Sequence, residues 1–452
     1  MEPLEHWLDR QYRHAAIAMQ ASISALTVVK TRPGFGQTMI AGRGSIVASP
    51  VPAAYDPDPD YFFHWFRDSA VVIDALRLLY RDGSGAPDAL AQFSDFVHFS
   101  LALQQLDGRA LVAAPAWRGR VAPDFVKFLR SDADLGAAHG EAIAAETRVN
   151  PDGTLDISSW PRPQNDGPAM RALTLMRWSQ SARFDADLDA AVAALLRADL
   201  AYTLKHWSEH CFDIWEEEKG LHYYTLSVSA AALHGGADWL LRHGSDAQAQ
   251  TAGAQAAAIH RLLDGYWLEH QGYYRSRVLE SGQRSAKELD IAVIFAALHG
   301  GGGDGAHSVD DARMHATLAR LEALFDAAYP INRQRPPSHA PAMGRYAGDV
   351  YYSGGAYYFS TLGAAEFCFR AAARAAADAA GSAATRELLA RGDAFLQTVR
   401  RFTPPDGGLS EQFDQHTGVQ TSARHLAWSY AAFISCVAAR RAIMVAPIGV
   451  AR

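Results

Sequence analysis

The chain has 452 residues, of which 49% are hydrophobic and 20% charged, so it can bury a large core. Its formal net charge is −7 and its basic residues are scattered, which excludes the concentrated basic surface of a nucleic-acid-binding protein. No apolar run approaches the roughly 18 residues that span a bilayer. We therefore expect neither nucleic acid nor a membrane as a partner.

The N-terminal segment and the cysteines bear on the compartment. Residues 1–13 include three acidic side chains and lack the basic start and apolar stretch of a signal peptide. Cys211, Cys368 and Cys436 lie far apart in apolar or aromatic surroundings, which is typical of reduced core cysteines in a cytoplasmic protein. Zinc sites need Cys and His at short spacing, and the sequence has no such cluster. We expect a cytoplasmic protein without a metal or other cofactor.

Helical periodicity dominates the chain from its first residues to its last, and alternating strand-like stretches are few and short. Apolar runs and the breakers between them predict about twelve helices. In chain order we expect them near residues 3–23, 67–81, 90–106, 167–181, 186–207, 223–242, 246–269, 286–299, 309–328, 355–378, 383–402 and 421–441. No linker rich in Ser, Thr and Pro divides them, so we expect a single domain over residues 1–452.

Twelve antiparallel helices suggest an all-α fold, an (α/α)6 barrel with six inner and six outer helices. Successive helices alternate in direction, so every even-numbered helix begins at the same end of such a barrel. Each of the long loops precedes an even-numbered helix; these loops cover residues 32–66, 107–165, 208–222, 270–285, 330–354 and 403–420. Loops of this length are usually functional or disordered, and these are too aromatic for disorder. We expect them to form one rim with a pocket.

Aromatic and charged residues gather within these loops, at residues 61–68, 160–168, 212–217, 344–346 and 409–414. Aromatic faces can cover the apolar C–H faces of a pyranose ring, while charged side chains bind its hydroxyl groups. Cleavage of a glycosidic bond also needs two carboxyl groups, one protonated to assist the leaving oxygen and one ionised. The composition of the rim therefore favours a site that cleaves sugars.

Five blocks carry a more specific signal: Pro59-Asp60-Tyr61-Phe62 through Arg67-Asp68-Ser69, Trp160 through Pro168, Trp215-Glu216-Glu217, Gly344-Arg345-Tyr346, and Ser410-Glu411-Gln412 through Trp428-Ser429-Tyr430. In these blocks and their order the chain resembles glycoside hydrolase family 15, the glucoamylases, over about residues 4–440. Five ordered blocks are far more specific than one motif. The resemblance implies an (α/α)6 barrel, in agreement with the helix count, and an exo-acting hydrolase of α-linked gluco-oligosaccharides.

The resemblance also implies roles for individual residues. Glu216 is the expected general acid, and Glu411 is the expected general base that activates water. Contacts with the substrate are implied for Tyr61, Trp65, Arg67, Asp68, Trp160, Trp215, Glu217, Arg345 and Trp428. Arg67 and Asp68 are expected to hold the terminal glucose. Trp428 lies within a predicted helix and fits a core role equally well.

The local sequence supports different protonation states for the two glutamates. Glu216 follows apolar residues and adjoins two further glutamates, so burial and like charge both favour its protonated form. Glu411 lies between Ser410 and Gln412, a polar setting that suits a carboxylate. A water molecule between Glu411 and the sugar implies carboxyl groups roughly 6.5–9.5 Å apart and inversion at the anomeric carbon.

Departures from the family's usual pattern modify this picture. Residues 353–357 replace the family's usual Asn-Gly-Asn-Pro-Trp, which predicts a more flexible segment that ends in Tyr357, and Phe66 replaces a small polar residue. We expect both changes near the second sugar, where they leave α-1,4 and α-1,6 linkages open. The sequence shows no starch-binding module, so we do not expect starch granules as the substrate. Asp166 and the Pro that follows it suit the start of a helix, so we leave Asp166 out of the site.

Other functions remain open at this point. An inverting phosphorylase would replace the base with a phosphate site, and Glu411 in its matching context argues against that function. A trehalase-type hydrolase fits the same blocks. A non-catalytic glucan-binding protein would keep the pocket but would typically lose a catalytic carboxylate, and both carboxylates are present here. The sequence does not indicate an oligomeric state.

Overall fold

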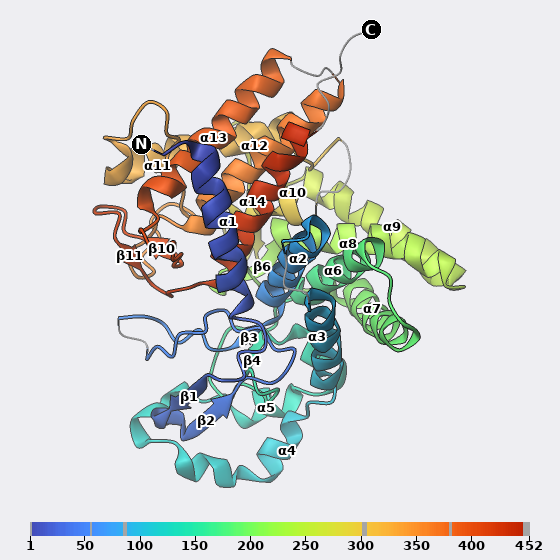
Figure 1. The fold of residues 1–452 in the computed structure, drawn as a ribbon. Coiled ribbons are helices and arrows are strands. Elements are labelled where there is room, and N and C mark those ends of the chain that lie inside the picture. The colour runs from blue at the N-terminus through green and yellow to red at the C-terminus, as the bar shows by residue number, and fades with distance from the viewer. Residues whose placement is uncertain (1, 55–56, 85–87, 301–304, 379–381, 446–452) are drawn as a thin grey trace. The chain divides into compact units, whose positions relative to one another are not determined.

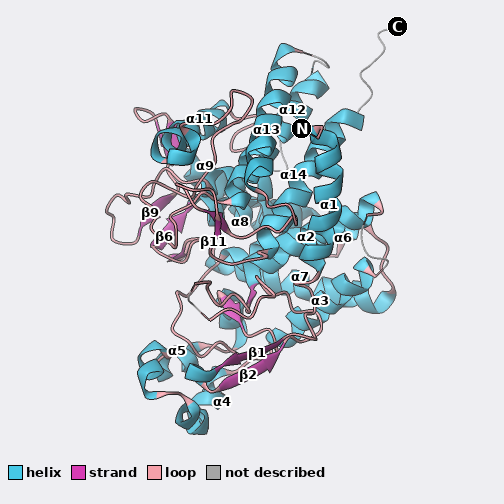
Figure 2. Ribbon diagram, turned by 60° about the vertical axis from the view of Figure 1, so that its left-hand side comes forward, coloured by secondary structure: helices cyan, strands magenta, loops and turns pink. Residues whose placement is uncertain are grey.

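The computed structural model describes residues 2–54, 57–84, 88–300, 305–378 and 382–445. Helices dominate these ranges (Figure 2). The long helices are α1 (Leu4–Gln20), α2 (Phe66–Asp82), α3 (Ala89–Leu103), α6 (Asp166–Ser181), α7 (Ala186–His206), α8 (Tyr223–Arg242), α9 (Asp246–Asp264), α10 (Ala292–His299), α11 (Ala312–Ala328), α12 (Tyr358–Asp378), α13 (Ala383–Phe402) and α14 (Ala427–Val445). Two shorter helices, α4 (Gly108–Ala113) and α5 (Asp132–Ala137), lie in the loop before α6.

The strands are two to four residues long. They are β1 (Val29–Arg32), β2 (Gln37–Ile40), β3 (His64–Trp65), β4 (Arg148–Val149), β5 (Cys211–Phe212), β6 (Lys219–His222), β7 (Trp267–Leu268), β8 (Tyr273–Tyr274), β9 (Arg277–Leu279), β10 (Gln412–Phe413) and β11 (Gln420–Thr421). Antiparallel pairs form between β1 and β2, β3 and β4, β5 and β6, β7 and β8, and β10 and β11. They fasten loops to one another and do not form a core sheet.

The twelve predicted helices are all present, but two of them begin about six residues later than expected. Helix α10 begins at Ala292, and the side chain of Asp290 accepts the backbone N–H of that residue at 2.8 Å. Helix α14 begins at Ala427 because β11 pairs with β10 and Ser422 has a left-handed φ of 64°. Both expected starts were therefore about six residues too early.

The chain divides into two compact units. Unit 1 comprises Met1–Ala18, Leu221–Ala231 and Ala256–Arg452, and unit 2 comprises Met19–Gly220 and Ala232–Gln255. The single domain expected over residues 1–452 stays a prediction.

In unit 2, helix α6 packs against α2 and α7. Helix α2 buries 12 of its 17 residues and α6 buries 12 of 16, whereas α7 buries 8 of 21. This difference is typical of inner helices, which are covered all round, and of outer helices, which bury one face. The close approach of α2 and α6 requires Gly167, since a Cβ there would lie 2.8 Å from the Cβ of Phe66.

In unit 1, helix α12 packs against α13 and α14, and the three run side by side (Figure 1). Helix α10 packs against α11 and α12. The amphipathic outer helix α13 buries 6 of its 20 residues, whereas α10 buries 7 of 8. Each unit therefore contains both inner helices, which are buried nearly all round, and outer helices, which bury one face.

The cysteines and the apolar helices bear on the earlier expectations. All three cysteines are buried and free, as expected, and burial raises the pKa of Cys368 to about 12, so this thiol stays protonated. In the part of the chain that the structure describes, no helix combines the length and apolarity needed to cross a membrane. The cytoplasmic location stays a prediction.

Candidate active site

A tight loop in unit 2 carries Glu216. Strands β5 and β6 pair antiparallel and close residues 213–218 into a loop. Inside it, the carboxylate of Asp213 accepts the backbone N–H groups of Trp215 at 2.7 Å, Glu217 at 3.3 Å and Glu218 at 3.0 Å. One buried carboxylate therefore fixes the backbone on both sides of Glu216.

The backbone of Glu216 is held in an unusual conformation. Its φ is 64°, in the left-handed region that non-glycine residues rarely adopt, at a cost of about 1–3 kcal/mol. Its N–H donates to the carbonyl oxygen of Asp213 at 2.9 Å, and the side-chain amide of Gln164 donates to the same oxygen at 2.7 Å. Such conformations persist where the surroundings enforce them, and they cluster at active sites.

The carboxyl group of Glu216 meets donors at both of its oxygens. Trp65 donates its indole N–H to Oε1 at 2.8 Å, and Trp160 donates its indole N–H to Oε2. The guanidinium of Arg67 lies 3.4 Å from Oε1. Trp65 ends β3, Arg67 follows in the first turn of α2, and Trp160 comes from the loop before α6. The structure thus brings together four of the predicted site residues.

The protonation of Glu216 follows from this setting. Its side chain is only 10% exposed. Burial raises the pKa of Glu216 and outweighs the guanidinium groups of Arg67 and Arg148 and the indole of Trp160, which all favour the ionised form. A carboxyl group with a raised pKa retains its proton closer to neutral pH, as a general acid requires.

Arg67 is surrounded by acidic groups. Its guanidinium lies 3.1 Å from the carboxylate of Asp68 and 3.4 Å from that of Asp166. Burial raises the pKa of both aspartates. The capping role expected of Asp166 is wrong, because Asn165 is the N-cap residue of α6 and it makes no side-chain capping bond. Asp166 instead faces Arg67, so sequence reasoning left a site-supporting residue out.

The remaining predicted residues of unit 2 lie close to this cluster in sequence or in space. The ring of Tyr61 packs 5.3 Å from that of Trp65. Trp215 and Glu217 flank Glu216 in the same loop. All three are half-buried, so each keeps some surface for a ligand.

In unit 1, the segment that carries Glu411 is fastened to the region where α14 begins. The backbone N–H of Glu411 donates to the carbonyl of Ala423 at 2.8 Å. The hydroxyl of Ser429 donates to the carbonyl of Ser410 at 2.8 Å, and the hydroxyl of Tyr430 accepts the N–H of Leu409 at 3.0 Å. These bonds explain in structural terms why residues 410–412 and residues 428–430 occur together in the last sequence block.

Glu411 is 8% exposed and has a side-chain donor that the sequence did not reveal. The hydroxyl of Ser422 donates to its Oε2. In the β10–β11 hairpin Gln412 pairs with Thr421, and this pairing brings the neighbouring residues Glu411 and Ser422 together. A hydroxyl that donates to a carboxylate stabilises the ionised form, which suits a general base.

Gln412 anchors residues 353–357. Its Oε1 accepts the N–H of Ser353 at 3.2 Å, the hydroxyl of Ser353 at 2.9 Å and the N–H of Gly355 at 3.3 Å. Its Nε2 donates to the hydroxyl of Tyr357 at 2.9 Å. The segment predicted to be flexible is therefore held by several hydrogen bonds, and sequence reasoning missed Gln412 as the residue that holds it.

Arg345 belongs to the same polar cluster. Its guanidinium makes two bonds to Asp349, at 2.7 and 2.6 Å, and the hydroxyl of Tyr357 also donates to Asp349 at 2.8 Å. Arg345, Asp349, Tyr357 and Gln412 thus form a buried chain that ends at the residue next to Glu411. Tyr357 is fully buried and offers no surface to a ligand.

Two aromatic residues pack in the core. The ring of Trp428 stacks on Phe359 at 4.9 Å and lies 5.7 Å from Phe295, with 4% of its surface exposed. Phe66 belongs to a hydrophobic cluster with Phe99, and it lines a cavity of about 480 Å³ that contains none of the predicted site residues. The expectation that Phe66 shapes the second sugar position is wrong, because its side chain lies in this cluster.

The two units thus contain carboxyl groups in contrasting environments. Glu216 is buried beneath two indole rings with a raised pKa, and Glu411 accepts a hydroxyl donor. Within the described residues, no three His, Cys, Asp or Glu side chains form a group that could hold a metal ion. Each unit therefore supplies one carboxyl group that can take part in proton transfer among aromatic and charged side chains.

Known proteins are similar to this chain in sequence. The sequence model for Glycosyl hydrolases family 15 matches residues 144–438. Glucoamylase 1 of Rhizopus oryzae is 28% identical over 96% of this chain and 70% of that protein. The probable glucoamylase of Schizosaccharomyces pombe is 28% identical over 88% of this chain and 85% of that protein.

Solved structures match over nearly the whole chain. The glucoamylase from Saccharomycopsis fibuligera aligns with a TM-score of 0.78 at 21% identity, over 98% of this chain and 96% of that chain. The family 15 glucoamylase from Hypocrea jecorina aligns with a TM-score of 0.80 at 23% identity, over 98% of this chain and 73% of that chain. These structures are (α/α)6 barrels, so the predicted fold class is confirmed.

Proposed function

Because the chain belongs to glycoside hydrolase family 15, we propose that it is an inverting exo-acting enzyme that releases glucose from the non-reducing ends of short α-1,4- and α-1,6-linked gluco-oligosaccharides. Membership of the family makes the protein a glycoside hydrolase with glucoamylase-like exo-glucosidase activity. The stereochemistry, the chain length, the linkages and the residue roles are the proposed part.

The observation that carries the proposal is the environment of Glu216. Its buried carboxyl group has an indole donor at each oxygen and a raised pKa. In the proposed reaction Glu216 gives its proton to the glycosidic oxygen as the bond to the anomeric carbon breaks. Glu411 takes a proton from water, whose oxygen forms the new bond to that carbon. The products are glucose and a chain shortened by one glucose unit.

The other predicted residues supply binding in this proposal. Arg67 and Asp68 hold hydroxyl groups of the terminal glucose, and the half-buried rings of Tyr61, Trp160 and Trp215 offer faces to its C–H groups. Arg345 is buried against Asp349, so its contribution is to order the segment beside Glu411.

The choice of linkage rests on residues 349–357, of which residues 353–357 differ from the family's usual pattern. Tyr357 is turned inward onto Asp349, whereas Tyr351 and Tyr352 keep exposed surface nearby. A changed aromatic contact with the second sugar alters specificity by about 10- to 200-fold. We therefore propose that isomaltose is cleaved at least as efficiently as maltose. An α-1,6 bond adds a rotatable methylene between the rings, so the second ring has more ways to fit a reshaped wall.

A panel of substrates tests this function. We expect glucose from maltose and isomaltose, with a kcat/KM for isomaltose equal to that for maltose or up to about tenfold above it, and slower release from soluble starch. A kcat/KM for isomaltose below that for maltose, with a rise along the malto-series, contradicts the linkage proposal alone. Preference for trehalose indicates a trehalase. Absence of glucose from every substrate, nigerose included, contradicts the hydrolase and favours a glucan-binding protein.

A further inference from the structure

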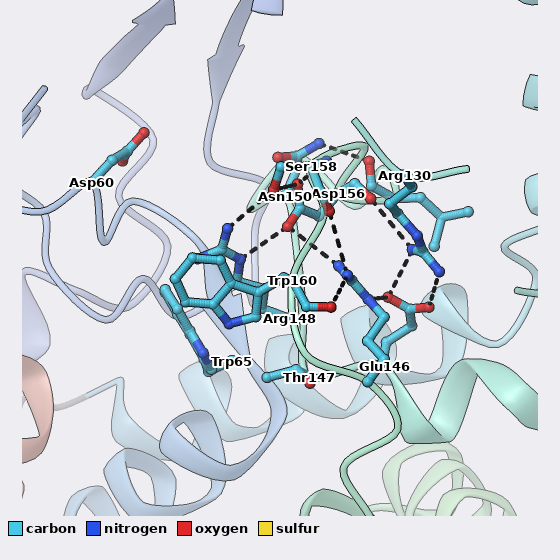
Figure 3. A network of polar contacts seen from close by, with 12 residues as sticks. Asp60, Trp65, Arg130, Glu146, Thr147, Arg148, Asn150, Asp156, Ser158 and Trp160 are labelled. Atoms are coloured by element: carbon cyan, nitrogen blue, oxygen red, sulfur yellow. Dashed lines mark hydrogen bonds and ion pairs between the residues drawn. The ribbon is translucent and has the colours of Figure 1, made fainter. Parts of the chain in front are cut away.

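One buried arginine lies against both tryptophans that donate to Glu216. Arg148 is the first residue of β4 and pairs with Trp65 of β3. The central carbon of its guanidinium lies 3.6 Å from the ring centroid of Trp160 and 4.9 Å from that of Trp65. The ring of Phe63 covers it at 3.9 Å. Figure 3 shows Arg148 and the two indole rings within a network of polar contacts.

The guanidinium of Arg148 is held in place by this network. Its Nε donates to Asp156 at 2.9 Å, and its Nη2 lies 3.2 Å from the hydroxyl of Ser158. Asp156 also pairs with Arg162 at 3.3 Å. Although burial opposes ionisation, the two guanidinium groups hold the pKa of Asp156 well below its usual range. Asp156 is therefore a carboxylate, and it fixes the plane of the Arg148 guanidinium.

The two indole rings pack against this guanidinium plane. The rings of Trp65 and Trp160 meet at 80° with centroids 6.5 Å apart, and each N–H bonds a different oxygen of Glu216. A flat cation on an aromatic face is attracted to that face, so it resists rotation of the ring. We propose that Arg148 is a positioning residue for the general acid, because it holds both indoles so that their N–H groups meet the carboxyl group of Glu216. The inference rests on the proposed role of Glu216.

The charge of Arg148 has a second effect on the same carboxyl group. Within unit 2, Arg67 and Arg148 lower the pKa of Glu216, and Asp68 raises it, against the larger effect of burial. Asp166 faces Arg67. Removal of the Arg148 charge therefore raises the pKa of Glu216, so the acid stays protonated to higher pH. The basic limb of the kcat/KM profile reports this pKa.

The test compares Arg148→Met with Arg148→Lys on two substrates, maltose and α-glucosyl fluoride. We expect Arg148→Met to lower kcat on maltose by about 10- to 100-fold, since a small misplacement of a catalytic group has effects of this size. The rate on glucosyl fluoride falls much less, because fluoride departs with little acid assistance. The basic limb moves to higher pH in Arg148→Met. In Arg148→Lys the basic limb keeps its wild-type position, because Lys keeps the charge. This variant recovers only part of the rate on maltose.

Arg130→Met is the matched control. Arg130 is also buried in this network, where it makes two bonds of 3.0 Å to Glu146, and Arg162 joins Glu146 to Asp156. Among the residues that the structure describes, Arg130 bonds Asp134, Glu146 and the carbonyl oxygen of Asp156, and it bonds neither Trp65 nor Trp160. We expect a similar loss of thermal stability, with an unchanged basic limb and an unchanged ratio of the two rates.

Three results overturn the inference. The first is an Arg148→Met variant whose ratio of the two rates and whose basic limb match the wild type. The second is an equal loss of rate on maltose and glucosyl fluoride in both Arg148→Met and Arg130→Met, and the third is full maltose turnover in Arg148→Lys. If Arg148→Met does not fold, the selective loss in Arg148→Lys decides. Failure of the proposed function is distinguishable from failure of this inference, because Glu216→Gln then retains turnover of maltose whatever the effect of substitutions at Arg148.

Discussion

Glu411→Gln lowers kcat on maltose by about 10²- to 10⁴-fold, the usual contribution of a general base. The amide of Gln cannot take a proton from water, whereas the proposed contacts with the terminal glucose come from other residues, so KM changes little. The geometry of the segment is retained because the backbone bond from residue 411 to Ala423 and the donor Ser422 are both kept. Steady-state kinetics on maltose and isomaltose measure both constants.

Glu366→Gln is the control for that substitution. Glu366 is a buried glutamate of α12 in the same unit, paired with Arg370 and Ser435. It has no proposed role in the reaction, so its replacement leaves kcat near the wild-type value. Near-normal turnover by Glu411→Gln means that another group activates water.

Glu216→Gln has an effect that depends on the leaving group. On maltose we expect kcat to fall by about 10²- to 10⁴-fold, since the alkoxide leaving group no longer receives a proton. On α-glucosyl fluoride we expect a loss below about tenfold, because fluoride needs little assistance. The basic limb of the pH profile on maltose also disappears, because the raised pKa that defines it belongs to Glu216.

Glu218→Gln provides the matched comparison within the same loop. The backbone N–H of this residue bonds Asp213, and the substitution keeps that bond, while its side chain has no proposed catalytic role. Both rates and the basic limb stay near wild type. Equal losses on maltose and glucosyl fluoride in Glu216→Gln contradict the acid assignment and indicate a binding or structural role.

The long helices were predictable because burial imposes a 3.6-residue period on them. The predicted start of α14 was wrong because the two-residue strand β11 lies at that position. Ser422 belongs to a hairpin that brings it to Glu411, and strands of this length have too few residues to show a period of two. The start of α10 shifted for a similarly local reason, since Asp290 accepts the first N–H of the helix.

The candidate site residues could be picked out in part because they lie in ordered blocks. Glu216 lies against Trp65, Trp160 and Arg67, three residues that belong to these blocks. Phe66 was misplaced, because the face of a residue at a helix start depends on the packing of α2 against α6. Trp428 could be either core or site from the sequence, and it packs in the core.

The residues that the sequence missed act through tertiary contacts. Arg148 stands in a two-residue strand with no neighbouring signal, and only its pairing with Trp65 reveals its position. Asp213 carried a readable signal, since the side chain of an Asp in a tight turn commonly accepts the backbone N–H two residues on. Its bond with the N–H of Trp215 follows that pattern.

The central claim is a single displacement by water, with Glu216 as the acid and Glu411 as the base. The most direct test is the anomeric configuration of the glucose first released by the wild-type enzyme, followed by proton NMR before mutarotation mixes the anomers. We expect β-glucose from the α-linked substrate, because water attacks the face opposite the leaving oxygen. Release of α-glucose as the first product contradicts the claim, since retention requires a covalent glycosyl-enzyme intermediate and a nucleophile in place of the base.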